Sequence, residues 1–270
     1  MRNRPDWAVS FAAISLVGAV PAPLNSYGLH DELMANLVDL QPKLLICDPE
    51  RFARVQNDLA ALSCKAMVVD GNAQQGDASW QAMTSVSTTA HQTPELLSAD
   101  PALVLFTSGA SSQAKAVLSS HMAVCQALFN IDFIGAISAM TSPKAIELMM
   151  AKALQPTTLT AVPLFHVSGL HAQLLTALRH DRRLVFIHRW DPQQAIRLIQ
   201  KEKITLGELD CILQKEKKII HLEIIYKFIF MCKYYLSNIN KINFIIIQNP
   251  INTLYREATL IFCISKSLFI

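Results

Sequence analysis

Residues 102–117 read ALVLFTSGASSQAKAV, and this stretch decides the fold. Its first part, 102–106, is a continuous apolar run with the length of a short buried strand. The part that follows, 107–115, consists of small and polar residues and ends at a single lysine, Lys115. A strand that leads into a loop of small residues lets several backbone N–H groups approach one anion. The stretch therefore predicts a phosphate-binding loop at the edge of a sheet.

The sequence on both sides alternates between short apolar runs and segments with helical spacing. Leucines at 29, 33, 37 and 40 recur at the helical period, and Asp191 and Pro192 form a helix start. Strands are predicted at 19–24, 43–48, 65–70, 158–165, 182–188 and 204–206. Helices are predicted at 7–17, 29–40, 49–62, 169–178, 191–203 and, behind the possible N-cap Ser119-Ser120, at 121–129. This alternation predicts an α/β fold with a mostly parallel sheet flanked by helices.

Composition excludes several classes of protein. The net charge is +3 and no basic run occurs, so we expect no nucleic-acid partner. No stretch of 18 apolar residues is free of charge, so we expect no membrane-spanning helix. The six cysteines are scattered and form no Cys-x-x-Cys pair. They indicate reduced thiols in a cytoplasmic protein, and neither a disulfide framework nor a zinc site.

The N-terminal segment 1–23 imitates a secretory signal, with two arginines, an apolar stretch and small residues near its end. However, Pro5 and Asp6 stand before the apolar stretch, and cleavage near Ala22 would leave Pro23 as the first residue. These features favour a buried helix that leads into a strand, with a signal peptide as the alternative.

The character of the chain changes after residue 206. Residues 1–206 contain 30 alanines and 10 isoleucines, whereas 207–270 contain 1 alanine and 15 isoleucines. The tail keeps neither helical nor strand periodicity, and its segment 241–255 is apolar and weakly charged, as aggregating segments are. We therefore predict a folded domain over 1–206 and a non-homologous tail, 207–270, that is not natively folded. A translated intron or a frameshift would produce such a tail, and a divergent domain is the alternative.

The predicted phosphate loop is not a P-loop. The pattern Gly-x4-Gly-Lys-Ser/Thr would start at Gly109, but Ala114 replaces its second glycine and Ala116 its hydroxyl. The stretch instead resembles the nucleotide loop of the acyl- and aryl-CoA synthetases, which are adenylate-forming, AMP-dependent synthetases and ligases. The positions in register with that loop are Thr107, Ser108, Gly109, Lys115, Val117, Ser120 and His121.

A second stretch, PLFHVSGL at 163–170, resembles another motif of the same family. The flanking segments 4–25 and 190–205 agree with it, so the resemblance spans roughly residues 4–205. Bacterial-type fatty acyl-CoA ligases are the most similar members. The resemblance implies an incomplete large adenylation domain, with ATP/AMP, Mg²⁺ and CoA as cofactors. It also implies a carboxylic acid, in particular a fatty acid, as the substrate that is activated to an acyl-adenylate and then joined to CoA.

The resemblance also assigns site residues. Those implied to bind the nucleotide are Thr107, Ser108, Gly109, Ser111 and Lys115. His166 and Gly169 are implied to line the acyl and adenylate pocket, and Gly169 to let the following helix pack closely. Turn chemistry at 107–108, a solvated Lys115 and a core role for His166 remain alternatives. His166 and His171 have no Asp, Glu or Cys at ligand spacing, so no metal ligand is assigned.

The chain also departs from the family pattern. Ser112, Ala114 and Ala116 replace a glycine, a proline and a glycine, which predicts weak ATP binding. The family's downstream motifs, including a Tyr-Gly-x-Thr-Glu loop and a late catalytic lysine, do not occur in 207–270. We therefore expect a ligase fragment without assigned catalytic residues that is inactive as this chain. A non-catalytic acyl- or nucleotide-binding derivative is the alternative. An unrelated hydrolase or reductase is disfavoured because Gly-x-Ser-x-Gly and Gly-x-Gly-x-x-Gly are missing.

Overall fold

The computed structural model describes residues 1–70, 76, 78–80, 94–107, 114–141 and 155–207. The chain divides into two units, Met1–Lys217 and Lys218–Ile270, and every described residue belongs to the first. The predicted tail, 207–270, lies outside the described residues except for Gly207.

The N-terminal part of the chain forms a small parallel sheet. Its strands are β1 (Leu44–Cys47), β2 (Lys65–Val68) and β3 (Ala78–Ser79), in the order β1-β2-β3. The helices before and between them are α1 (Pro5–Leu16), α2 (His30–Leu40), α3 (Pro49–Phe52) and the short 3-10 helix η1 (Leu59–Leu62). Leu33 and Leu37, which the helical period placed on one face of α2, are both buried here. They pack with Val55, Leu59, Cys64 and Ala66.

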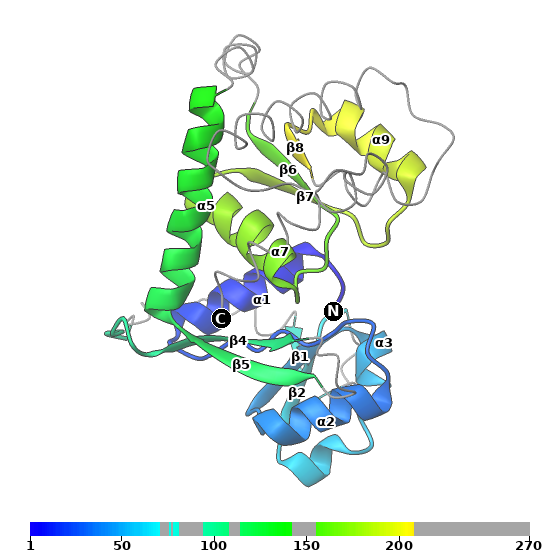
Figure 1. Ribbon diagram of the computed structural model, residues 1–270. Coiled ribbons are helices and arrows are strands. Elements are labelled where there is room, and N and C mark those ends of the chain that lie inside the picture. Colours follow the sequence, from blue (N-terminus) through cyan, green and yellow to red (C-terminus); the bar gives the residue numbers. More distant parts are fainter. Residues whose placement is uncertain (71–75, 77, 81–93, 108–113, 142–154, 208–270) are drawn as a thin grey trace, which may run out of the picture. The chain divides into compact units, whose positions relative to one another are not determined.

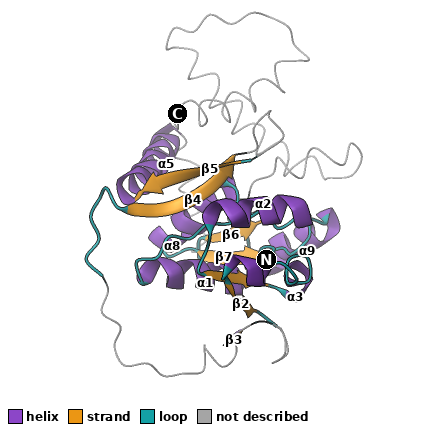
Figure 2. Cartoon of the chain, turned by 90° about the horizontal axis from the view of Figure 1, so that it is seen from below, coloured by secondary structure: helices purple, strands orange, loops and turns teal. Residues whose placement is uncertain are grey.

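The strand 101–107 and the strand 115–120 pair as the two arms of a hairpin (Figure 2). Strands β4 (Pro101–Thr107) and β5 (Lys115–Ser120) are antiparallel, with Thr107 opposite Lys115. The predicted strand at 102–106 is confirmed, whereas β5 was not predicted. Helix α5 (His121–Thr141) follows directly, and its start confirms the predicted N-cap, because the Oγ of Ser120 accepts a hydrogen bond from the N–H of Ala123 at 3.3 Å.

A third sheet has β6 (Thr157–Thr160) in its centre, parallel to both β7 (Arg183–Phe186) and β8 (Leu206–Gly207) (Figure 1). Between β6 and β7 run three consecutive helical segments, α7 (Val167–Gly169), the π-helix η2 (Leu170–Leu175) and α8 (Thr176–Arg179). Helix α9 (Pro192–Glu202) precedes β8, and Asp191 caps it as predicted, accepting from the N–H of Gln194 at 2.6 Å. Of the five described strand pairings, four are parallel, so the predicted mostly parallel α/β fold is confirmed.

The predicted strand at 19–24 is wrong. Pro21 and Pro23 lack an N–H, so this segment cannot donate the ladder of bonds that a strand requires. Its bond to β4 is the one in which the carbonyl of Pro21 accepts from the N–H of Val104 at 3.0 Å. The segment therefore lies beside β4 without becoming part of its sheet.

One hydrophobic cluster joins the two predicted motifs. Leu103 lies on β4, while Leu164 and Leu170 flank His166 in the second motif, and all three are almost fully buried in the same cluster. Leu174 of η2 and the residues Trp7 and Phe11 of α1 complete it. The rings of Trp7 and Phe11 are stacked at a centroid distance of 5.5 Å. The hairpin and the segment with His166 are therefore built on a common core.

Candidate functional site

The hairpin brings two of the predicted phosphate ligands together. Thr107 and Lys115 are register partners at the end where the chain passes from β4 to β5, and both are exposed. The Oγ1 of Thr107 is 3.5 Å from the carbonyl oxygen of Lys115. Among the described residues no carboxylate pairs with the Lys115 ammonium, which leaves its charge available to an anion. Ser108, Gly109 and Ser111 lie outside the described residues.

Two of the departures from the family pattern can be judged from the backbone. Ala114 and Ala116 are described, and neither has a positive φ. Ala116 lies in β5, exposed and opposite Phe106. Alanine therefore meets no conformational penalty at these two positions. At Ala116 this differs from the expectation of a left-handed residue where the family has glycine. Ser112 lies outside the described residues.

His166 occupies the turn between β6 and α7. Its N–H donates to the carbonyl of Pro163 at 3.1 Å, and its own carbonyl accepts from the N–H of Leu170 at 2.8 Å. The backbone of His166 is extended, as an N-cap residue requires. Partial burial lowers the pKa of the imidazole below its ordinary value. The side chain is therefore neutral near pH 7 and able both to donate and to accept a hydrogen bond.

A line of aromatic contacts supports the His166 ring. The ring centroids of Phe165 and His166 are 4.4 Å apart. The ring of Tyr27 meets that of Phe165 edge-on, with a centroid distance of 6.2 Å. The Arg2 guanidinium carbon in turn lies 5.0 Å from the centroid of the Tyr27 ring. Such pairs favour defined relative orientations of the rings. Tyr27 is thus a neighbour of the site that the sequence did not reveal, because nothing in its local pattern distinguishes it from a surface tyrosine.

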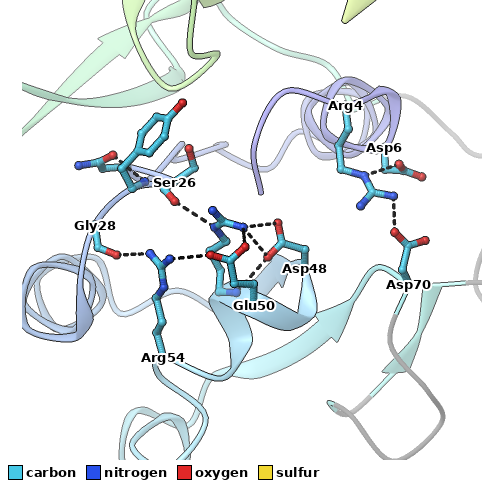
Figure 3. Close-up of polar contacts among 11 residues, drawn as sticks. Arg4, Asp6, Ser26, Gly28, Asp48, Glu50, Arg54 and Asp70 are labelled. Atoms are coloured by element: carbon cyan, nitrogen blue, oxygen red, sulfur yellow. Dashed lines mark hydrogen bonds and ion pairs between the residues drawn. The ribbon is translucent and has the colours of Figure 1, made fainter. Parts of the chain in front are cut away.

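Two arginines hold the turn that carries Tyr27 (Figure 3). The Nε of Arg51 donates to the carbonyl of Ser26 at 2.9 Å, and the Nη1 of Arg54 donates to the carbonyl of Gly28 at 2.6 Å. These two carbonyls flank Tyr27, so the backbone is fixed on both sides of the aromatic ring.

The carboxylates of α3 orient these arginines. Glu50 accepts from Arg51 at 2.6 Å and from Arg54 at 2.9 Å, so it links both guanidinium groups (Figure 3). Asp48 caps α3 by accepting from the N–H of Arg51 at 2.9 Å, and its oxygens lie 3.4 Å from the Nη1 of the same residue. Arg51 and Asp48 are both buried, so their charges compensate each other away from water.

Asn3 connects the N-terminus to the His166 turn. Its buried side chain donates from Nδ2 to the carbonyls of Thr160 at 3.2 Å and Val162 at 2.8 Å. Its Oδ1 accepts from the N–H of Leu164 at 3.1 Å. The amide thereby fixes the end of β6 and the start of the turn. No sequence signal pointed to this role, because the partners are at least 157 positions away along the chain.

Gly169 is where α7 touches the turn before it. A Cβ at this position would lie 2.2 Å from the Pro163 carbonyl oxygen and 2.9 Å from that of Val162. Only the hydrogen of a glycine fits at this position, so the close packing predicted for Gly169 is confirmed. Its role in substrate binding stays a prediction. The next residue, Leu170, is fully buried in the core.

A small cavity lies beside the turn. It has a volume of about 30 Å³ and is lined by Tyr27, Pro163, Trp190 and other side chains that include Arg2 and Asn3. The Nε of Arg2 and the Nε1 of Trp190 are buried and have no partner among the described residues. A space of this size holds one or two water molecules, which would satisfy these donors.

His171 differs from His166 in being buried. Burial lowers the pKa of its imidazole to about 4, so the ring is neutral over the physiological range. In the described part of the chain no three His, Cys, Asp or Glu side chains are placed to hold a metal ion. The Mg²⁺ implied by the resemblance would arrive with the nucleotide, and it stays an expectation.

Known proteins with similar sequences share this region. A family model described as "AMP-binding enzyme" matches residues 1–208. The chain is 28% identical over 208 residues to an indoleacetate–CoA ligase of Aromatoleum aromaticum, covering 77% of this chain and 38% of that protein. It is 23% identical over 214 residues to 4-coumarate–CoA ligase 4 of Arabidopsis thaliana, covering 76% of this chain and 35% of the relative. The chain thus spans little more than a third of the length of these relatives.

Solved structures agree with the sequence comparison. A putative long-chain-fatty-acid CoA ligase from Rhodopseudomonas palustris superposes with a TM-score of 0.59 at 26% identity, covering 76% of this chain and 48% of the other. ATP-bound MatB from the same organism has the same fold, with a TM-score of 0.55 at 21% identity, covering 74% and 36% of the two chains. Since the family model covers more than two thirds of the sequence, the chain belongs to the AMP-binding enzyme family, whose members among its relatives are acyl- and aryl-CoA ligases.

Proposed function

We propose that this chain supplies the first part of the adenylation domain of an ATP-dependent carboxylic acid–CoA ligase. In the complete reaction, a carboxylate and ATP form an acyl-adenylate and pyrophosphate, and the CoA thiol then displaces AMP. The observation that carries the proposal is the shared core of the two motifs. Leu103 lies on β4, the strand that ends at Thr107, and it packs in one cluster with Leu164 and Leu170, which flank His166 in the sequence. Support also comes from the names of the relatives, which are acid–CoA ligases.

In this proposal the exposed hairpin end holds the nucleotide's phosphates. Lys115 contributes a compact point charge, and Thr107 contributes a hydroxyl on the neighbouring strand. Ser108, Gly109 and Ser111 would add hydroxyls and backbone N–H groups. Mg²⁺ bound with ATP would neutralise further phosphate charge. The neutral His166 would line the acyl pocket with Gly169, where a charged imidazolium would disfavour an apolar acid.

We propose further that the chain alone does not complete the reaction. Adenylation relies on charges that are held in place before the reaction begins. Thr107 and Lys115 supply only part of such an arrangement, and no residue of this chain is assigned as the catalytic group. We expect ATP to bind more weakly than at micromolar affinity. The acid is proposed to be a fatty acid, while the relatives' names, indoleacetate and 4-coumarate ligase, make aryl acids the competing class.

The test combines binding with turnover. The full chain is incubated with ATP, Mg²⁺, CoA and one of three acids (palmitate, indoleacetate or 4-coumarate), and pyrophosphate release is followed. ATP binding is measured in parallel by isothermal titration for the wild type, for Lys115→Met and for the control Lys65→Met, an exposed lysine of the N-terminal sheet. Because a hydrogen bond to a charged group is worth about 1.5–3 kcal/mol, Lys115→Met should weaken ATP binding about 10- to 100-fold. Lys65→Met should leave it unchanged.

The possible outcomes distinguish the proposal from its alternatives. Weak ATP binding that depends on Lys115, without pyrophosphate, supports the proposal. Pyrophosphate release would show a complete enzyme and refute the expected inactivity. The absence of both ATP binding and pyrophosphate release would refute the nucleotide-binding part of the proposal and favour a non-catalytic acyl-binding derivative. ATP binding that ignores Lys115 would refute the assignment of the hairpin.

A further inference from the structure

Two buried hydrogen-bond donors face the small cavity beside the His166 turn. The Nε of Arg2 and the Nε1 of Trp190 are buried, and neither has a hydrogen-bond partner among the described residues. Both residues line the cavity, whose volume is about 30 Å³. A buried N–H group without an acceptor costs free energy, and a buried indole N–H usually has a partner. The two donors therefore need an acceptor, and the cavity is the space that can hold one.

The charge around this cavity has one sign. Arg2 is cationic, and none of the described residues that line the cavity is an aspartate or a glutamate. Arg2 takes part in none of the ion pairs found in the described part of the chain. Its guanidinium carbon lies 5.0 Å from the centroid of the Tyr27 ring, which attracts a cation without neutralising it. Water would satisfy both N–H groups but would leave the charge of Arg2 without a counter-ion.

The cavity lies at an edge of the sheet where ligands commonly bind. Ala161 and Pro163, which line it, follow the carboxyl end of β6. Ile187 and His188, which also line it, follow the carboxyl end of β7. These two strands are parallel neighbours. Open α/β sheets bind their ligands outside the carboxyl ends of the strands, so the position agrees with a binding site.

Both donors are held in place by the scaffold. Trp190 packs against the hydrophobic cluster that contains Leu159 and Ile187, which fixes the indole. Asn3, the residue after Arg2, donates two hydrogen bonds to backbone carbonyls at the end of β6 and just beyond it. Donors that are ordered before a ligand arrives lose little conformational freedom on binding. The cavity is therefore preorganised for an acceptor.

We propose that this cavity binds a small monovalent anion, such as chloride, between the Arg2 guanidinium and the Trp190 indole N–H. The volume admits an ion that is little larger than a water molecule. One guanidinium balances one negative charge, whereas a divalent anion would bring a second charge into a partly buried space without compensation. A bound anion would link the N-terminal segment to the residues that follow β7, and so stabilise the surroundings of the His166 turn.

Larger anionic ligands do not fit the cavity. The phosphate groups of nucleotides and lipids need more space than one or two water molecules occupy. None of the described helices is long and apolar enough to cross a membrane. The inference does not depend on the proposed ligase function, because it concerns the counter-ion of Arg2 and no step of adenylation.

The experiment follows the indole N–H signal of Trp190 by NMR in the ¹⁵N-labelled full chain. Chloride replaces gluconate, which is too large for the cavity, at constant sodium concentration. A hydrogen bond to the anion should move the signal, and the shift should saturate. Thermal unfolding is measured in the same series. At a chloride concentration ten times the Kd, the folded state is favoured about 11-fold more than without chloride, which should raise the Tm by about 3–6 °C.

Substitutions test which groups hold the anion. Arg2→Met removes the charge and should raise the Kd for chloride by about 10-fold or more, because a hydrogen bond to a charged group is worth at least that factor. Trp190→Phe keeps an aromatic ring but removes the N–H, so it identifies the indole signal and should reduce the rise in Tm. The matched control is Arg189→Met, an exposed arginine that does not line this cavity. It should bind chloride as the wild type does.

The wild-type titration decides the proposal even if a variant does not fold. A Trp190 signal that stays in place up to molar chloride would overturn it, because water or a carboxylate from another part of the chain would then fill the cavity. An equal shift in Arg2→Met would refute the role of the guanidinium. An equal response to sulfate would show a general effect of salt and no site. A saturating shift that Arg2→Met weakens and Arg189→Met retains supports the anion site.

Discussion

Substitution of Gly169 by alanine probes how the site is assembled. The glycine has φ −72° and ψ −44°, which any residue adopts, so a conformational requirement does not explain its presence. Steric contact does. An added Cβ would lie 2.2 Å from the Pro163 carbonyl oxygen, where ordinary contact begins at 3.4 Å. Either α7 or the turn that carries His166 has to move by about 1 Å to make room, because the obstructing atoms belong to the backbone.

The magnitude follows from two opposing effects. Overpacking a tight site destabilises a protein by about 1–3 kcal/mol, and backbone atoms place this case at the upper end. Alanine offsets up to about 1 kcal/mol of this, because it favours the helix more than glycine does. We expect the free energy of unfolding to fall by about 2 kcal/mol. For a domain of this size that corresponds to a decrease in Tm of about 4–8 °C.

The matched control is Gly135→Ala in α5, where nothing lies within 4 Å of the new Cβ. Here only the helix preference acts, so the variant should be more stable than the wild type by up to about 1 kcal/mol. Thermal and urea unfolding give the two values, and the NMR signals of the His166 ring report movement of the turn. If Gly169→Ala were as stable as Gly135→Ala and left the His166 signals in place, the close contact with Pro163 would be refuted.

Three further perturbations test the supports of the site. Asn3→Ala leaves the Val162 carbonyl and the Leu164 N–H unpaired. It should therefore lower the free energy of unfolding, measured in urea, by about 2–4 kcal/mol. The control Asn130→Ala on α5 should change it by less than about 1 kcal/mol. Arg51→Met should lower the free energy of unfolding by about 3 kcal/mol, because it leaves Asp48 buried without its partner. The control Arg54→Met changes a more exposed pair and should lower it by at most about 1 kcal/mol. Equal losses for the two variants would contradict the burial of the Arg51–Asp48 pair. His171 has a folded-state pKa of about 4, below an unfolded value of about 6.5, so the unfolded chain binds the extra proton between these values. Stability should therefore fall by up to about 3 kcal/mol as the pH drops from about 6.5 to 4, and His171→Gln should flatten that dependence in urea titrations; an unchanged slope would show that the ring is not buried and neutral.

Local sequence signals predicted the helix starts and most strands. Asp191 and Ser120 cap the helices that follow them, because a cap depends on hydrogen bonds within three residues. The strand β5 was missed because its pairing with β4 depends on a partner across the hairpin and its own composition resembles a helix lead-in. The segment 19–24 was wrongly predicted as a strand because it is short and apolar, but its prolines remove the N–H donors that a strand requires.

The residues that support the site could not be predicted from local patterns. Asn3 contacts backbone more than 150 positions away, and Tyr27 meets Phe165 across a comparable distance in sequence. Nothing near Arg51 indicates that it holds the Ser26 carbonyl. These contacts depend on how separate elements pack, whereas Thr107, Lys115 and His166 stand in motifs that can be read along the chain. The scaffold of the site was therefore harder to predict from the sequence than the residues that are proposed to carry its chemistry.

The division between scaffold and chemistry affects how a changed phosphate loop should be judged. The core that joins β4 to the His166 turn is buried, and the Asn3 and Gly169 contacts fix that turn. The hairpin end with Thr107, Lys115 and Ala116 is exposed. Substitutions there remove few packing contacts, so they should leave the free energy of unfolding nearly constant. Under the proposed function they should nevertheless alter phosphate binding. Persistence of the fold therefore says little about retention of ATP binding, and the two properties have to be measured independently in variants of Lys115 and Ala116.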